Sequence, residues 1–71
     1  MSGLKLFSGK ELIKILKSHG FETLRIKGSH HFLKHIDGRT TVIPVHKNET
    51  ISKGLLSKIL RDTELNINDL I

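Results

Sequence analysis

Residues 21–45 carry the sequence FETLRIKGSHHFLKHIDGRTTVIPV, and this stretch decides the fold. Apolar and basic side chains alternate over residues 24–27, which is typical of a half-buried strand. Gly28-Ser29 interrupts the alternation, and the pattern resumes as a second strand predicted from His30 to Ile36. Two neighbouring strands joined by so short a break indicate an antiparallel pair.

A second hairpin is predicted at Asp37-Gly38, because a type I′ turn needs positive φ angles that Asp and Gly tolerate. The third strand, Thr40 to Val45, is rich in β-branched residues. Pro44 cannot donate a hydrogen bond to a neighbouring strand, so this strand is expected to lie at an edge of the sheet or to end near Pro44. The sequence therefore predicts a three-stranded antiparallel meander.

A helix is predicted on the N-terminal side of the meander, over about residues 9–19. Ser8 and Glu11 have the spacing of a capping box, and apolar residues then recur at helical intervals. Gly20 is placed to end the helix in a left-handed conformation. Phe21 is expected to fold back against it.

A second helix is predicted after the meander, with Ser52 as its N-cap and Gly54 in its first turn. Its apolar stripe consists of Leu55, Leu56, Ile59 and Leu60. Residues 66–71 are expected to form a capped turn that brings Leu70 and Ile71 against the core. The resulting class is α+β with the order α-β-β-β-α, in which two helices cover one face of the sheet.

Composition and charge limit the number of domains, the cellular compartment and the kind of partner that the chain can have. A chain of 71 residues is predicted to form one domain, 1–71, and the absence of cysteine favours a reducing compartment. No apolar run is long enough to span a bilayer, and residues 1–7 lack the apolar stretch of a signal peptide, so the cytoplasm is expected. The net charge of +5 favours a phosphate-rich partner, most commonly nucleic acid.

The candidate site lies at one end of the predicted sheet. His30 follows the Gly28-Ser29 turn, where the backbone can approach a ligand closely. His46 comes directly after the third strand, and in an antiparallel meander that end neighbours the start of the second strand. Three lysines are expected at the same end: Lys27, Lys47 and Lys53. A solvated polar strand end is the alternative interpretation.

The other histidines have simpler explanations. His19 closes the first helix, where a cation offsets the helix dipole. His31 and His35 are predicted on the opposite strand face from His30. No Asp, Glu or Cys close in sequence completes a metal site for them, so no metal and no cofactor is predicted.

A histidine among cations suits the cleavage of RNA without a metal. A general base removes the proton of the ribose 2′-OH, and the freed oxygen attacks the adjacent phosphate. Cations stabilise the charge on the phosphoryl oxygens, and an acid protonates the leaving 5′-oxygen. Imidazole can fill either proton-transfer role near neutral pH.

Four motifs resemble those of the HicA (YcfA-like) toxins of bacterial toxin–antitoxin pairs. They occur in the family's order and spacing over nearly the whole chain: Lys27-Gly28-Ser29-His30-His31, Asp37-Gly38-Arg39, Pro44-Val45-His46, and Gly54 with Ile59-Leu60. The resemblance implies a fold like the double-stranded-RNA-binding domain. It also implies a toxin that arrests translation as an mRNA interferase, a metal-independent endoribonuclease.

The resemblance places the catalytic histidine at His30 and the family's Pro-x-His position at His46. The sequence leaves both His46 and His31 open as the general acid or second histidine. The residues expected to bind RNA are Lys27, Gly28, Ser29, Arg39, Lys47 and Lys53. A HicB-type antitoxin, expected to be acidic, would neutralise the toxin. The chain is expected to be monomeric alone and to enter a higher-order assembly with that antitoxin, with no membrane partner.

Two positions depart from the family pattern, and one alternative function stays open. Leu55 stands where many members have Thr, and Glu64 where many have Gly before the terminal segment. The alternative is a non-catalytic double-stranded-RNA-binding module, which grips phosphates with basic residues near its last helix. Such a module would bind RNA and leave it intact.

Overall fold

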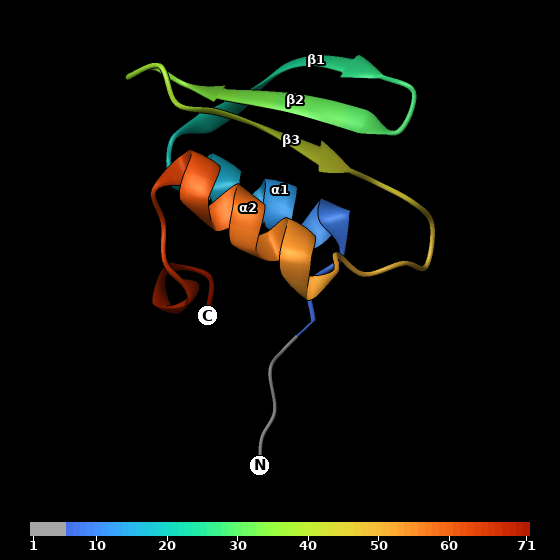
Figure 1. Cartoon of the computed structure of the whole chain (residues 1–71). Helices are drawn as coiled ribbons and strands as arrows, with labels where there is room; N and C mark the ends of the chain where they lie inside the picture. Colours follow the sequence, from blue (N-terminus) through green and yellow to red (C-terminus); the bar gives the residue numbers. More distant parts are fainter. Residues whose placement is uncertain (1–5) are drawn as a thin grey trace.

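The predicted order α-β-β-β-α is confirmed in a computed structural model, which describes residues 6–71. Residues 1–5 of the predicted domain 1–71 lie outside the described range. The elements are α1 (Gly9–Ser18), β1 (Phe21–Lys27), β2 (His30–His35), β3 (Thr40–Pro44), α2 (Lys53–Thr63) and the short 3-10 helix η1 (Ile67–Asp69). Figure 1 shows their arrangement.

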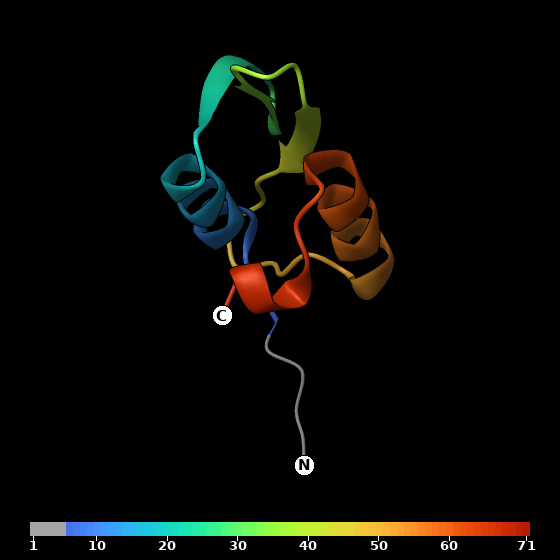
Figure 2. The same ribbon diagram turned by 90° about the vertical axis from the view of Figure 1, so that its left-hand side faces the viewer.

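The sheet is an antiparallel meander in the order β1-β2-β3. Figure 2 shows α1 and α2 side by side on one face of the sheet, while no helix formed by residues 6–71 lies on the other face. α1 packs on β1 and β3, and α2 packs on β3. The predicted two-layer arrangement is therefore confirmed. None of the helices described is long and apolar enough to cross a membrane.

The core lies between the sheet and the two helices and draws on almost every element. Its buried apolar side chains are Phe7, Leu12, Leu16, Phe21, Leu33, Ile43, Ile51, Ile59 and Leu70. Leu70 belongs to the terminal turn, so the prediction that this turn packs on the core is confirmed for Leu70. The same prediction is wrong for Ile71, which is 78% exposed.

Both helix starts are capped as the sequence predicts. The Ser8 hydroxyl accepts a hydrogen bond from the Glu11 backbone N–H, and the Glu11 carboxylate accepts one from the Ser8 backbone N–H. The Ser52 hydroxyl caps α2 by accepting from the Leu55 backbone N–H. Gly20 ends the turn after α1 with a φ of +95°, in the left-handed region.

β1 departs from simple alternation. A bulge between Thr23 and Arg25 leaves Leu24 without a partner on β2. Leu24 is 63% exposed and Ile26 is 58% exposed, so the half-buried apolar face predicted for them is wrong. Phe21 instead supplies the buried aromatic ring of this strand.

The second hairpin has a different turn from the predicted type I′. His35 N–H donates to the Arg39 carbonyl, so Ile36, Asp37 and Gly38 form a three-residue connection. Gly38 is the residue of this connection with a positive φ, at +103°, whereas type I′ needs two. Pro44 ends β3, which is an edge strand as predicted.

Candidate functional site

The candidate site is built on the turn between β1 and β2. Gly28 has a φ of +58° and Ser29 does not, which is the pattern of a type II′ hairpin. Apart from the two neighbouring residues, no group lies within 4 Å of the position that a Cβ would take at Gly28. A side chain would therefore have room here, and glycine is favoured because of the positive φ. The turn is therefore an open, tightly held corner of the sheet.

His30 lies beside this turn on the face of the sheet that carries no helix. Its cross-strand partners are Lys27 on β1 and Pro44 on β3, and directly opposed residues share a face. Both His30 and Lys27 are exposed. Within residues 6–71, no hydrogen bond or ion pair occupies the side chain of either residue. The imidazole and the ammonium group are thus free to meet a ligand together.

The segment after β3 is attached to the same turn. The Val45 backbone N–H donates to the Ser29 carbonyl over 2.8 Å, which extends the ladder one residue past Pro44. His46 and Lys47 follow at once, both exposed, and the Glu49 N–H closes a turn on the His46 carbonyl at 3.2 Å. His46 is therefore brought to the His30 end of the sheet, as predicted.

His46 differs from His30 in its surroundings. It lines two hollows between its loop and the starts of the helices, one beside Ser8 and Gly9 and the other beside Leu55. His30 lines neither of them. The two imidazoles share an end of the molecule without contacting each other.

Lys53 is the first residue of α2 and is exposed. Figure 1 shows the β1–β2 turn, the loop after β3 and the starts of α1 and α2 all on the same side of the molecule. The structure therefore gathers Lys27, Lys47 and Lys53 around one end, as predicted. In the part of the chain that the structure describes, none of these three lysines has an acidic partner.

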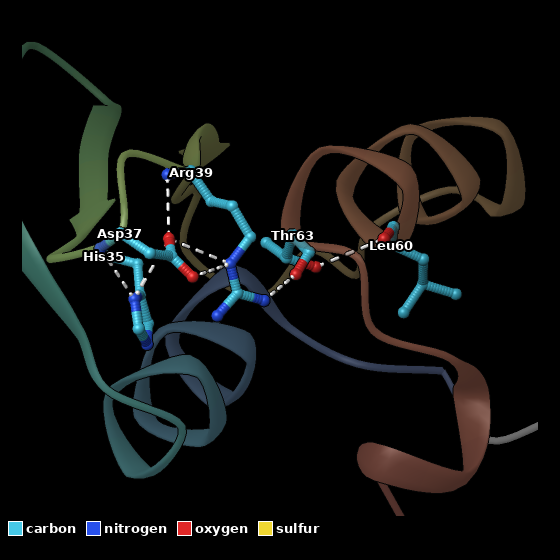
Figure 3. A network of polar contacts seen from close by, with 5 residues as sticks. All are labelled: His35, Asp37, Arg39, Leu60 and Thr63. Atoms are coloured by element: carbon cyan, nitrogen blue, oxygen red, sulfur yellow. Dashed lines mark hydrogen bonds and ion pairs between the residues drawn. The ribbon is translucent and has the colours of Figure 1, made fainter.

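Arg39 is not part of this end. It follows the β2–β3 turn, at the opposite end of β2 from His30, and Figure 3 shows its guanidinium directed inward. Its Nε donates to both carboxylate oxygens of Asp37, at 3.1 and 2.9 Å, and its Nη1 donates to the Thr63 carbonyl at the end of α2. The guanidinium also stands 5.2 Å from the centre of the Phe21 ring.

These contacts give Arg39 a structural role that joins the second hairpin to the last turn of α2. The hydrogen bonds from Arg39 lower the pKa of the Asp37 carboxyl below its usual 3.8. The prediction that groups Arg39 with the RNA-binding lysines therefore has no support from its position.

Three histidines lie away from the candidate site. His31 and His35 share the helix-facing side of β2 with Leu33, opposite His30, as predicted. The His35 ring packs edge-on against Phe21, with centroids 5.1 Å apart. His19 caps the end of α1, and its Nε2 lies 3.1 Å from the Asp69 carbonyl, so it joins α1 to η1.

No candidate metal centre is found in residues 6–71, where no three His, Asp or Glu side chains cluster closely enough to hold an ion.

Gly9 is a residue that the sequence patterns did not single out. It is buried at the start of α1, and a Cβ there would overlap the Pro44 carbonyl oxygen and lie 3.2 Å from the Val45 Cα. The absent side chain therefore lets α1 begin directly against the strand end that leads to His46. A glycine in the first helical position was the visible signal, since helix propensity disfavours it.

A comparison with protein families relates this architecture to a known group. The family model described as the HicA toxin of bacterial toxin–antitoxin systems matches residues 9–65, which run from the start of α1 to just past the end of α2. No curated protein matches the chain significantly. The matched range includes the β1–β2 turn, His30, His46 and Lys53. This chain therefore belongs to the HicA family of toxins from bacterial toxin–antitoxin systems.

Proposed function

We propose that this toxin is a metal-independent endoribonuclease that cleaves mRNA and so arrests translation. The observation that carries the proposal is the free, exposed imidazole of His30, which shares a sheet face with Lys27 beside the open Gly28-Ser29 turn. A group that must take a proton from a substrate hydroxyl has to be accessible and free of protein partners. His30 meets both requirements.

In the proposed reaction His30 removes the proton of a ribose 2′-OH. The 2′-oxygen bonds to the adjacent phosphorus, and the bond from phosphorus to the 5′-oxygen breaks, which leaves a 2′,3′-cyclic phosphate and a 5′-hydroxyl end. The ammonium groups of Lys27, Lys47 and Lys53 stabilise the charge on the phosphoryl oxygens. Backbone groups of Gly28 and Ser29 approach the RNA at the turn.

A general acid must protonate the leaving 5′-oxygen. His46 fits this role better than His31, because His46 is exposed at the same end of the sheet as His30. His31 is half-buried on the opposite, helix-facing side. We assign the acid to His46.

The test compares cleavage of a labelled RNA by the parent chain and by His30→Ala. We expect the variant to lose at least about 100-fold in rate, the usual contribution of a general base, and to melt like the parent. His19→Gln is the matched control, because it alters a histidine far from His30 and should keep full activity. Both assays are run with and without EDTA, which should not change the rate.

A His30→Ala variant that cleaves as fast as the parent would contradict the proposal. RNA that is bound but keeps intact ends would instead support a non-catalytic RNA-binding module. In cells, the parent expressed alone should arrest growth and His30→Ala should not.

The toxin family implies an antitoxin partner, and we propose a HicB-type protein of acidic character. The toxin carries a net charge of +5, and three of its lysines lie at the His30 end without an ion-pair partner in residues 6–71. Such a partner would act in the cytoplasm, where mRNA is translated. The toxin and its antitoxin should co-purify as an assembly that loosens as salt is raised.

A further inference from the structure

The face of the sheet that carries no helix has an unusual composition. Figure 2 shows this face turned away from both helices. Cross-strand register places on it nine residues that we call the open face, one of them acidic and opposite Lys34: Glu22, Arg25, Lys27, His30, Phe32, Lys34, Thr40, Val42 and Pro44. His30 is therefore one member of a larger surface.

Phe32 is the central residue of the open face. Its cross-strand partners are Arg25 and Val42, and it is only partly buried, because no helix lies over this side. Its neighbour on the strand, His31, faces the helices instead. The packing of a two-layer domain would favour the reverse, with the ring inside and the imidazole outside. The position of this half-buried ring, on the side away from the helices, is thus not explained by the core.

Arg25 lies directly against this ring. Its guanidinium carbon is 4.6 Å from the ring centroid, the geometry of a cation–π contact. Lys27 and Lys34 flank the pair, and within residues 6–71 none of these three cations has an ion-pair partner. A stacked aromatic ring among unpaired cations on an open sheet face is how proteins hold unpaired nucleic-acid bases.

We propose that the open face binds single-stranded RNA, with a base stacked on the Arg25–Phe32 pair and phosphates held by Lys27 and Lys34. Phe32 is two residues from His30 on the same face, about 7 Å along the strand. That separation is close to the length of one extended nucleotide, so the stacked base lies next to the bond presented to His30. A base in a duplex has both faces covered, so the surface selects unpaired RNA.

This inference rests on the proposed function for the role of His30 but is measured separately, by binding. The probe is a labelled octamer of 2′-O-methyl RNA, which has no 2′-OH to attack and so cannot be cleaved. The chain contains no Trp or Tyr, so Phe32→Trp introduces its single tryptophan on the open face. Stacking of a base should quench that fluorescence as the octamer saturates the protein.

Affinity is then compared by fluorescence anisotropy. Phe32→Leu keeps an apolar side chain but removes the ring, and should weaken binding about 10- to 100-fold, as loss of base stacking does. Phe32→Tyr keeps the ring and should bind within about 3-fold of the parent. Lys34→Gln should weaken binding and reduce its salt dependence, whereas Lys17→Gln, on the exposed side of α1, should do neither.

The proposal is overturned if the octamer fails to bind the parent, if Phe32→Trp is not quenched at saturation, or if Phe32→Leu binds like the parent. A duplex that binds more tightly than the single strand would overturn it as well. Thermal melts of each variant establish that the compared proteins are folded. Loss of cleavage in His30→Ala with unchanged octamer binding supports both proposals, while normal cleavage in that variant contradicts only the proposed function.

Discussion

Removal of the Arg39 side chain tests whether this residue belongs to the fold or to the RNA site. Arg39→Met keeps an unbranched side chain and removes the guanidinium from a residue whose side chain is only 22% exposed. The variant loses the hydrogen bond to the Thr63 carbonyl and the contact with the Phe21 ring. We therefore expect a less stable protein with unchanged chemistry at His30.

The expected loss follows from these contacts. A hydrogen bond from a charged group contributes about 1.5–3 kcal/mol, and a cation–π contact at a partly exposed site about 0.5–1 kcal/mol. The ion pair with Asp37 adds little, because that carboxylate is half exposed and solvent screens it. The sum is about 2–4 kcal/mol, which lowers the Tm of a domain of this size by about 8–32 °C.

The assay pairs calorimetry with RNA cleavage at a temperature where both proteins are folded. Lys27→Met is the matched control, because it removes one positive charge beside His30 from a side chain with no protein partner. We expect the opposite pattern for it: a Tm within about 2 °C of the parent and a reduced rate of cleavage. An Arg39→Met variant that melts like the parent yet cleaves poorly would refute our assignment of Arg39 to the fold.

Two further predictions concern stability. Glu64 ends α2 in the left-handed conformation, with a φ of +59°. Glu64→Gly should therefore raise the free energy of unfolding, measured by urea titration, by about 0.5–1 kcal/mol. Glu64→Ala keeps the strained conformation and should show no such gain. The hydrogen bond from Lys58 lowers the pKa of Asp62 in the folded protein below its usual 3.8. In acid the unfolded chain therefore binds more protons than the folded protein, and the free energy of unfolding should fall as the pH drops below about 4. Asp62→Asn should flatten that decline in urea midpoints measured from pH 5 to pH 2, and an equally steep decline would count against the Lys58–Asp62 pair as its cause.

Local signals in the sequence predicted the elements well. The capping box of Ser8 and Glu11, the left-handed Gly20 and the break at Gly28-Ser29 each depend on residues within one turn of each other. Such features depend only on residues close together in the sequence, so the structure shows them where the sequence predicts them. Glu64 is a similar case. The resemblance to HicA toxins predicts Gly at this position, and Glu64 adopts the positive φ that Gly favours.

Features set by distant partners were not predictable in the same way. The bulge at Leu24 changes which side chains of β1 face the core, and no local pattern marks it. Arg39 depends on Thr63, 24 residues along the chain, and Gly9 on the strand end at Pro44. For the candidate site, alternation and topology placed His30, His46 and Lys27 correctly at one end of the sheet. Alternation alone also put Phe32 beside His30, but its significance depends on a face that no helix covers.

The core has a consequence for when the toxin becomes active during its own synthesis. Phe7 and Leu12 pack in the same cluster as Ile59 and Leu70, which are synthesised later. Ribosomes add about 5–20 residues per second, so α1 must wait several seconds before its buried face can be covered. The growing chain therefore cannot complete the core under the sheet that presents His30 until Leu70 has emerged from the ribosome. An antitoxin that recognises the folded toxin would therefore have no complete surface to bind before that segment is available.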